Sequence, residues 1–193
     1  MSKLAIAFSL LASPVLVMLG GAPVGATGLE IDIAGEANGT VTIDLFEDIA
    51  PAHVAQITEL ASEGAYDGVV FHRVIDGFMA QTGDVEFGNT SVAGFSMQMA
   101  GRGGSDRADL PAEFSDTPFD RGVVGMARSQ NPNSANSQFF IMFEPGHFLN
   151  GQYTVVGKVT EGMDVVDAIK RGTGGNGAVV GEADVMTTVT VTD

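Results

Sequence analysis

Hydrophobic and polar residues alternate along several short stretches of the chain, which is the pattern of half-buried β-strands. In residues 40–46 every second position is a branched hydrophobic residue, namely Val41, Ile43 and Leu45. Residues 29–33 have a similar composition, and Asn38-Gly39 lies between the two stretches. Because Asn and Gly tolerate the positive φ of a tight turn, the pattern predicts an antiparallel hairpin.

Further short runs rich in Val, Ile and Phe predict the other strands. They are residues 69–75, 78–83, 122–128, 138–143, 154–159 and 185–192. Many short strands separated by turn residues predict a mainly β protein, either an antiparallel barrel or a sandwich. Residues 85–110 show almost no periodicity, and we expect them to form a long surface excursion.

Two helices are expected, over residues 51–63 and about 163–171. Pro51 fits the first helical position, where its missing N–H costs no hydrogen bond. Val54, Ile57 and Leu60 then form one apolar stripe, as on a helix that packs against a core. In the second helix acidic residues come early and basic residues late, which is favourable for the helix dipole.

The first 26 residues have the layout of a secretory signal peptide. Lys3 is the only charged residue before Glu30, residues 4–19 are mostly apolar, and small residues end the segment at Ala26. A membrane anchor is the alternative, but the run is shorter than the ~20 residues that span a bilayer and contains Pro14. We therefore expect a signal peptide at 1–26, one domain at 27–193, no stable membrane insertion, and a periplasmic or secreted protein.

Composition excludes several kinds of site. The formal net charge is −15, from 24 acidic and 9 basic residues, so nucleic acid is not an expected partner, and self-repulsion favours a monomer. With no Cys there are no disulfides or thiolate zinc sites, and the three His lack metal-ligand spacing. Residues 172–177 match G-x-G-x-x-G but follow a helix and precede a strand, so we read them as a flexible turn. No cofactor or metal is expected.

One set of segments remains unexplained by composition. It consists of F-H-R at 71–73, G-F-M-A-Q-T-G at 77–83, S-Q-F-F-I at 137–141, F-L-N-G-Q-Y at 148–153 and V-G-K-V-T-E-G-M at 156–163. An Arg on an apolar strand is unusual, because Arg is rarely buried without a partner. The residues alone leave open that Arg73 is an edge-strand residue that reaches solvent.

These segments, in this order and spacing, resemble the signature of the cyclophilin family of peptidyl-prolyl cis–trans isomerases, from about residue 41 to 172. The resemblance implies a closed eight-stranded antiparallel β-barrel capped by two α-helices. It also implies a catalytic role for Arg73, oriented by Gln81. The substrate-binding residues that it implies are Phe78, Met79, Ala127, Arg128, Gln138, Phe140, Phe148, Leu149 and Tyr153. Among these, Ala127 and Arg128 would present backbone groups.

Three positions depart from many members of the family, which have Asn, Trp and His where Arg128, Phe148 and Tyr153 stand. In this family the binding of cyclosporin depends on the Trp, so the resemblance implies that cyclosporin binds weakly here. The expected function is isomerisation of X–Pro bonds in proline-containing polypeptides, assisting the folding of exported proteins. A module that grips Pro-containing segments without turnover, and a β-barrel carrier of small ligands, are the alternatives.

Overall fold

The computed structural model describes residues 27–193, so the predicted signal peptide at 1–26 lies outside the described residues. The described chain contains nine strands and two α-helices, with two short 3-10 turns at His147–Leu149 and Gly175–Gly177. The strands are β1 (Gly28–Ala34), β2 (Gly39–Leu45), β3 (Val69–Val70), β4 (Arg73–Ile75), β5 (Met79–Thr82), β6 (Val123–Met126), β7 (Phe139–Met142), β8 (Val155–Glu161) and β9 (Val185–Thr192). The helices are α1 (Pro51–Ser62) and α2 (Met163–Ala168).

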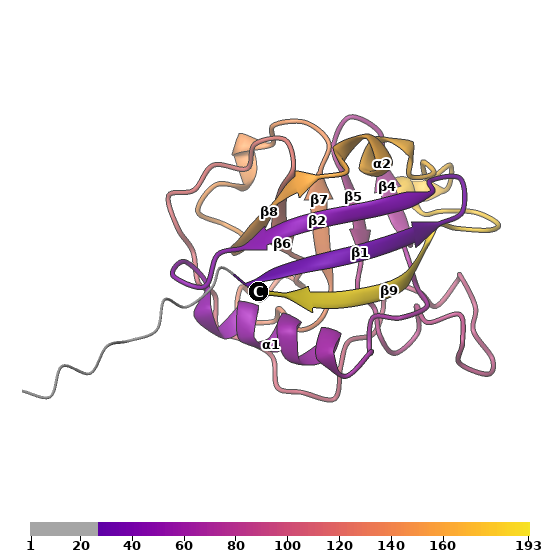
Figure 1. The fold of residues 1–193 in the computed structure, drawn as a ribbon, viewed down its shortest axis with the longest axis horizontal. Coiled ribbons are helices and arrows are strands. Elements are labelled where there is room, and N and C mark those ends of the chain that lie inside the picture. The colour runs from indigo at the N-terminus through magenta and orange to yellow at the C-terminus, as the bar shows by residue number, and fades with distance from the viewer. Residues whose placement is uncertain (1–26) are drawn as a thin grey trace, which may run out of the picture.

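All nine strands belong to one curled antiparallel sheet in the order β3-β9-β1-β2-β8-β6-β7-β5-β4. The predicted hairpin is confirmed, because β1 pairs with β2 in a register that places Ile31 opposite Val41. In Figure 1, β9, β1 and β2 form the near face, and β5, β6 and β7 lie behind it. The sheet therefore wraps around an interior, as the prediction of a mainly β fold required.

The prediction of a closed eight-stranded barrel is not confirmed. Residues 69–75 form two strands rather than one, because the chain changes partner between β3 and β4: β3 pairs with β9, whereas β4 pairs with β5. At the change, the Phe71 N–H donates to the Asp184 carbonyl at 2.9 Å and the His72 N–H donates to the Gln81 carbonyl at 3.2 Å. The sheet is thus a half-barrel whose terminal strands, β3 and β4, are not paired with each other in the described sheet.

Side chains alternate between two hydrophobic clusters. Along β7, Phe139 and Ile141 point into the main core, and Phe140 and Met142 point into a second cluster on the opposite face. This period-2 division explains why all four residues of β7 are buried. The second cluster also receives Met79 from β5, so it forms an apolar platform outside the main core.

The two helices pack at opposite margins of the sheet (Figure 1). Helix α1 contacts β9 and ends close to the predicted position, whereas α2 contacts β2 and stops at Ala168, short of the predicted end at Arg171. Ile169 has extended ψ, and the Lys170 N–H donates to the buried Asp184 carboxylate at 2.6 Å. This capture of the backbone by a distant carboxylate ends the helix early. No helix within residues 27–193 is long and apolar enough to cross a membrane.

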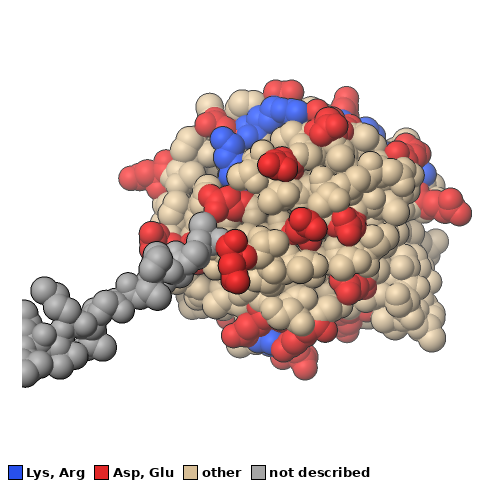
Figure 2. Space-filling model, in the orientation of Figure 1, with Lys and Arg blue, Asp and Glu red and all other residues tan. Residues whose placement is uncertain are grey.

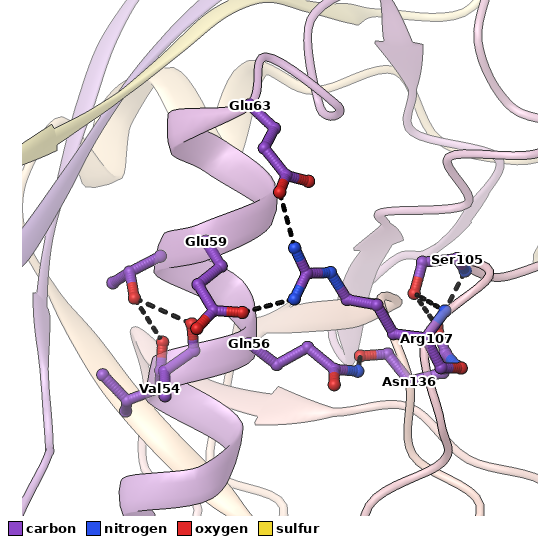
Figure 3. A network of polar contacts seen from close by, with 9 residues as sticks. Val54, Gln56, Glu59, Glu63, Ser105, Arg107 and Asn136 are labelled. Atoms are coloured by element: carbon purple, nitrogen blue, oxygen red, sulfur yellow. Dashed lines mark hydrogen bonds and ion pairs between the residues drawn. The ribbon is translucent and has the colours of Figure 1, made fainter.

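The long excursion is tied to α1 by polar contacts (Figure 3). Arg107 forms ion pairs with Glu59 of α1 and with Glu63, the residue that directly follows this helix. Asn136 accepts hydrogen bonds from the backbone N–H and hydroxyl of Ser105, both at 2.7 Å. The excursion is therefore a fixed part of the surface beside the sheet.

Candidate active site

Arg73 begins the edge strand β4 and is half-buried. Its Nη1 donates to Gln81 Oε1 at 3.1 Å. On the other side, Nε donates to the Asn176 carbonyl at 2.9 Å and Nη2 to Asn176 Oδ1 at 3.1 Å. Three oxygen acceptors thus hold the guanidinium, and N–H groups remain for a ligand, because arginine has five of them. One of these is directed at the Met79 sulfur, 4.0 Å from Nη1.

Gln81 and Gln138 continue this hydrogen-bonded chain. Gln81 Nε2 donates to Gln138 Oε1 at 2.9 Å, and Gln138 Nε2 donates to the carbonyls of Gly101 and Gly103 at 3.2 and 2.7 Å. Each amide can point only one way in such a chain, because its oxygen accepts from one neighbour and its nitrogen donates to the next. The orientation of Arg73 is therefore linked to the glycine-rich part of the excursion.

The guanidinium faces an apolar pocket of about 280 Å³ that lies on the second hydrophobic cluster. Its lining residues are Arg73, Phe78, Met79, Gln81, Ala127, Arg128, Phe140, Phe148, Leu149 and Tyr153. Ten of the eleven residues predicted for the site are thus brought together. The rings are fixed by contacts with one another. Phe140 stacks on Phe119 with ring centroids 5.8 Å apart and meets Tyr153 edge-on with centroids 5.9 Å apart.

The eleventh residue, Gln138, lines a neighbouring pocket of about 430 Å³ instead. Gln81, Ala127 and Arg128 line both pockets, so the two are adjacent. The Ala127 N–H donates to the Gln138 carbonyl at 2.9 Å, and the Ala127 carbonyl accepts no backbone hydrogen bond from residues 27–193. Arg128 brings a side chain that the prediction did not use: its guanidinium lies over the Tyr153 ring, 4.3 Å from the centroid.

Asn176 holds the Arg73 guanidinium by two hydrogen bonds, and the sequence prediction did not include it, because residues 172–177 were read as a flexible turn. Asn176 has a left-handed backbone with φ of 57°, which turns both its carbonyl and its side chain toward Arg73. Asn is among the few non-glycine residues that adopt this conformation readily. An Asn between glycines at 175 and 177 was the available signal.

Replacing Asn176 with Gly is expected to lower kcat by about tenfold, the lower end of the effect of losing one hydrogen bond to a charged group. Glycine keeps the carbonyl acceptor and tolerates the positive φ, so the melting temperature should change little. Asn176→Asp, which keeps an acceptor at the same position, is the matched variant. Steady-state kinetics with a proline peptide would measure the change, and an unaltered kcat in Asn176→Gly would show that the side chain does not position Arg73.

Burial lowers the pKa values of two basic groups beside the site. Partial burial lowers the pKa of Arg73 from its ordinary value, yet the group stays charged because arginine is not deprotonated in proteins. His72 is buried against Gly101, and desolvation lowers its pKa from 6.5 to about 4 although the Asp84 charge opposes the shift. His72 is therefore neutral at physiological pH, and Arg73 supplies the positive charge.

The buried His72 predicts that stability falls at mildly acidic pH. The unfolded chain takes up a proton near pH 6.5 and the folded chain only near pH 4, so the unfolded state holds more protons between these values. The contribution of His72 to the free energy of unfolding is present above pH 6.5 and is lost as the pH falls toward 4. The free energy of unfolding should therefore fall by about 2 kcal/mol between pH 7 and pH 5. Urea unfolding at both pH values should show this loss in the wild type. A His72→Gln variant with the same pH dependence would contradict the assignment.

The chemistry available at this site is limited and specific. Within residues 27–193 no group of three or more His, Cys, Asp or Glu side chains is placed to hold a metal ion. The residues that line the apolar pocket are aromatic and aliphatic groups, one amide and two guanidinium groups. Such a pocket can hold an apolar ring while Arg73 donates hydrogen bonds to an atom at its rim.

Comparison with known proteins agrees with this geometry. The family model described as "Cyclophilin type peptidyl-prolyl cis-trans isomerase/CLD" matches residues 29–191. A probable peptidyl-prolyl cis-trans isomerase of Brucella suis is 68% identical over 143 residues, which cover 74% of this chain and 72% of that protein. Peptidyl-prolyl cis-trans isomerase B of Bacillus subtilis is 34% identical over 137 residues, covering 71% and 87%.

A solved structure also matches. The crystal structure of a cyclophilin from Hirschia baltica superposes with a TM-score of 0.66 at 26% identity, covering 84% of this chain and 72% of that one. The family match extends over nearly all of the described sheet and includes every residue of the apolar pocket. The chain therefore belongs to the cyclophilin-type peptidyl-prolyl cis–trans isomerase family.

Proposed function

We propose that this isomerase rotates X–Pro bonds of polypeptide substrates by holding the proline ring in the apolar pocket beside Arg73. The observation that carries the proposal is the Arg73 guanidinium, fixed by Gln81 and Asn176 at the rim of that pocket. The barrier to rotation about a peptide bond is about 18–20 kcal/mol. An enzyme that lowers it needs no nucleophile, because no covalent bond is made or broken.

Arg73 would act on the twisted transition state. As the bond rotates, the proline nitrogen loses its resonance with the carbonyl and regains a basic lone pair. A guanidinium N–H that is already fixed in place can donate to that lone pair, and the planar ground states offer it no equivalent acceptor. The interaction therefore strengthens in the transition state, which is the condition for catalysis.

The apolar platform would hold the ring while the preceding carbonyl rotates. Met79, Phe140 and Leu149 are almost fully buried beneath the pocket, so they have little freedom to move when a ligand binds. Phe148 is 65% exposed at the rim and packs on Phe78 with ring centroids 5.5 Å apart. Phe148 stands where many members of the family have Trp, so we expect cyclosporin to bind weakly.

We further propose that the mature protein is exported, acts as a monomer, and assists the folding of other exported proteins. The support is the charge and hydropathy pattern of residues 1–26 and the high net negative charge, which disfavours self-association. Mass spectrometry of the protein recovered from its native host tests export and processing. An intact Met1 on the recovered protein would refute cleavage.

A protease-free assay tests the proposed activity. Exchange between the cis and trans forms of a proline peptide is followed by NMR with and without catalytic amounts of the protein. We expect exchange to accelerate in proportion to enzyme concentration. Peptide binding without acceleration would instead identify a module that grips proline segments.

A further inference from the structure

The charge of the residues that line the two pockets is opposite in sign to that of the whole molecule. Acidic residues outnumber basic ones by 24 to 9, and in the view of Figure 2 they are spread over the whole face. The two pockets are lined instead by three arginines, Arg73, Arg102 and Arg128, and by one acidic residue, Asp109. The lining of the two pockets is therefore positive on balance, while the carboxylates of Asp84 and Glu86 adjoin Gly103 from outside the lining.

These three arginines also lack carboxylate partners. Among residues 27–193, the basic residues that form ion pairs with carboxylates within 4.0 Å are Arg107, Arg121, Lys170 and Arg171, with His53 and His147 forming similar contacts. The arginines of the two pockets and Lys158 form none in that part of the chain. In a protein with such an excess of acid, three unpaired arginines beside one site indicate that their charge is available to a ligand.

The second pocket is polar where the first is apolar. Besides its glycines it is lined by the hydroxyl and amide side chains of Ser105, Ser129, Ser134 and Asn136. Its one acidic residue, Asp109, is exposed and already accepts a hydrogen bond from Asn136 Nδ2 at 3.2 Å. These hydroxyl and amide groups already donate within the protein, so what the pocket offers a ligand is the positive charge of Arg102 and Arg128.

Arg128 is held in position between the two pockets. Its Nε and Nη2 donate to the Gln152 carbonyl at 3.2 and 2.8 Å, and its Nη1 donates to the Ser129 carbonyl at 2.9 Å. The Tyr153 ring supports the guanidinium from one side. Carbonyl oxygens and an aromatic face orient the group without neutralising its charge, so the charge remains effective toward a substrate.

We propose that the second pocket binds the carboxylate side chain of an Asp or Glu that lies close to the proline of the substrate, and that Arg102 and Arg128 determine this preference. The proposal rests on the proposed isomerase function. A polypeptide advances about 3.3–3.6 Å per residue, and the pockets share three lining residues. With proline in the first pocket, a residue within about three positions of it reaches the second.

The negative charge of the rest of the molecule does not cancel this preference. At physiological ionic strength exposed charges are screened beyond about 8 Å. The arginines at the pocket act within that distance on a bound carboxylate, whereas most of the acidic surface does not. We expect a preference of about fivefold, the size that a partly exposed charge pair provides.

The test compares peptides that differ only in charge. A neutral proline peptide carries Gln at one of the three positions before or after the proline, and in its partner that Gln is replaced by Glu. For the wild type, kcat/KM measured by NMR exchange should be about fivefold higher for the Glu peptide at one or more positions. In Arg102→Gln the ratio should fall toward one.

Lys158→Gln is the matched control, because it removes the same charge from an exposed position of β8 outside both pockets. This variant should keep the wild-type ratio. Equal rates for Glu and Gln peptides at every position, or an unchanged ratio in Arg102→Gln, would overturn the proposal while the neutral peptides are still isomerised. No acceleration of the neutral peptides would overturn the isomerase function itself, and the preference with it.

Discussion

Replacing Arg73 with Ala is expected to lower kcat/KM for a proline peptide by about 10²–10³, the usual cost of removing one preorganised donor from a transition state. The protein should remain folded, because Arg73 is only half-buried and lies on an edge strand. NMR exchange at equal enzyme concentration would measure the loss. Activity equal to the wild type would refute the role given to the guanidinium.

Arg73→Lys provides the matched comparison. Lysine keeps a positive charge but cannot donate at once to Gln81 and to both oxygens of Asn176, because its ammonium is a single point on a flexible chain. We expect it to lose most of the activity as well. If Arg73→Lys retained nearly full activity, charge alone would suffice, and the fixed geometry of the three hydrogen bonds would have no catalytic role.

Replacing Asp84 with Ala is expected to destabilise the protein by about 4 kcal/mol, because it leaves four part-buried N–H groups without their charged acceptor. Asp84 is fully buried, and Oδ1 accepts from the N–H groups of Glu86 and Phe87 at 3.1 and 2.9 Å. Oδ2 accepts from those of Gly101 and Gly103 at 2.6 and 3.0 Å. One carboxylate thus joins the start of the excursion to its glycine-rich part.

The same change should also lower activity in the protein that remains folded. Gln138 donates to the carbonyls of the two glycines that Asp84 holds, and through Gln81 this chain orients Arg73. Urea unfolding and kcat at low temperature would measure both effects. Asp32→Ala is the control, because it removes an exposed carboxylate that accepts a hydrogen bond from Thr40 alone among residues 27–193, and it should cost less than about 1 kcal/mol. A similarly small loss for Asp84→Ala would contradict its role.

Local patterns in the sequence predicted those parts of the fold that depend on neighbouring residues. The alternation in 40–46 predicted the hairpin because its partner strand is close in the chain. By contrast, residues 69–75 were predicted as one strand, and the break depends on the carbonyl of Asp184, more than 100 residues away. A long-range contact of this kind leaves no local pattern to read.

The candidate site shows the same difference between local patterns, which the sequence reveals, and long-range contacts, which it does not. Residues two apart on a strand share a face, as Met79 and Gln81 do, but only the structure shows that β5 and β7 are paired, with Gln81 opposite Phe140. Asn176 was missed because its segment has no periodicity and its function depends on a left-handed backbone. The charge of Arg128 was likewise overlooked, because the family resemblance gave that position a backbone role only.

Arg73 is expected to stabilise the rotating bond rather than the bound peptide. The most direct measurement is the cis–trans exchange rate of a peptide on the enzyme, taken by NMR together with its dissociation constant, for the wild type and Arg73→Ala. We predict that exchange on the enzyme slows more than 100-fold while the dissociation constant changes by less than about threefold. Parallel loss of affinity and rate, or an unchanged exchange rate, would contradict the account.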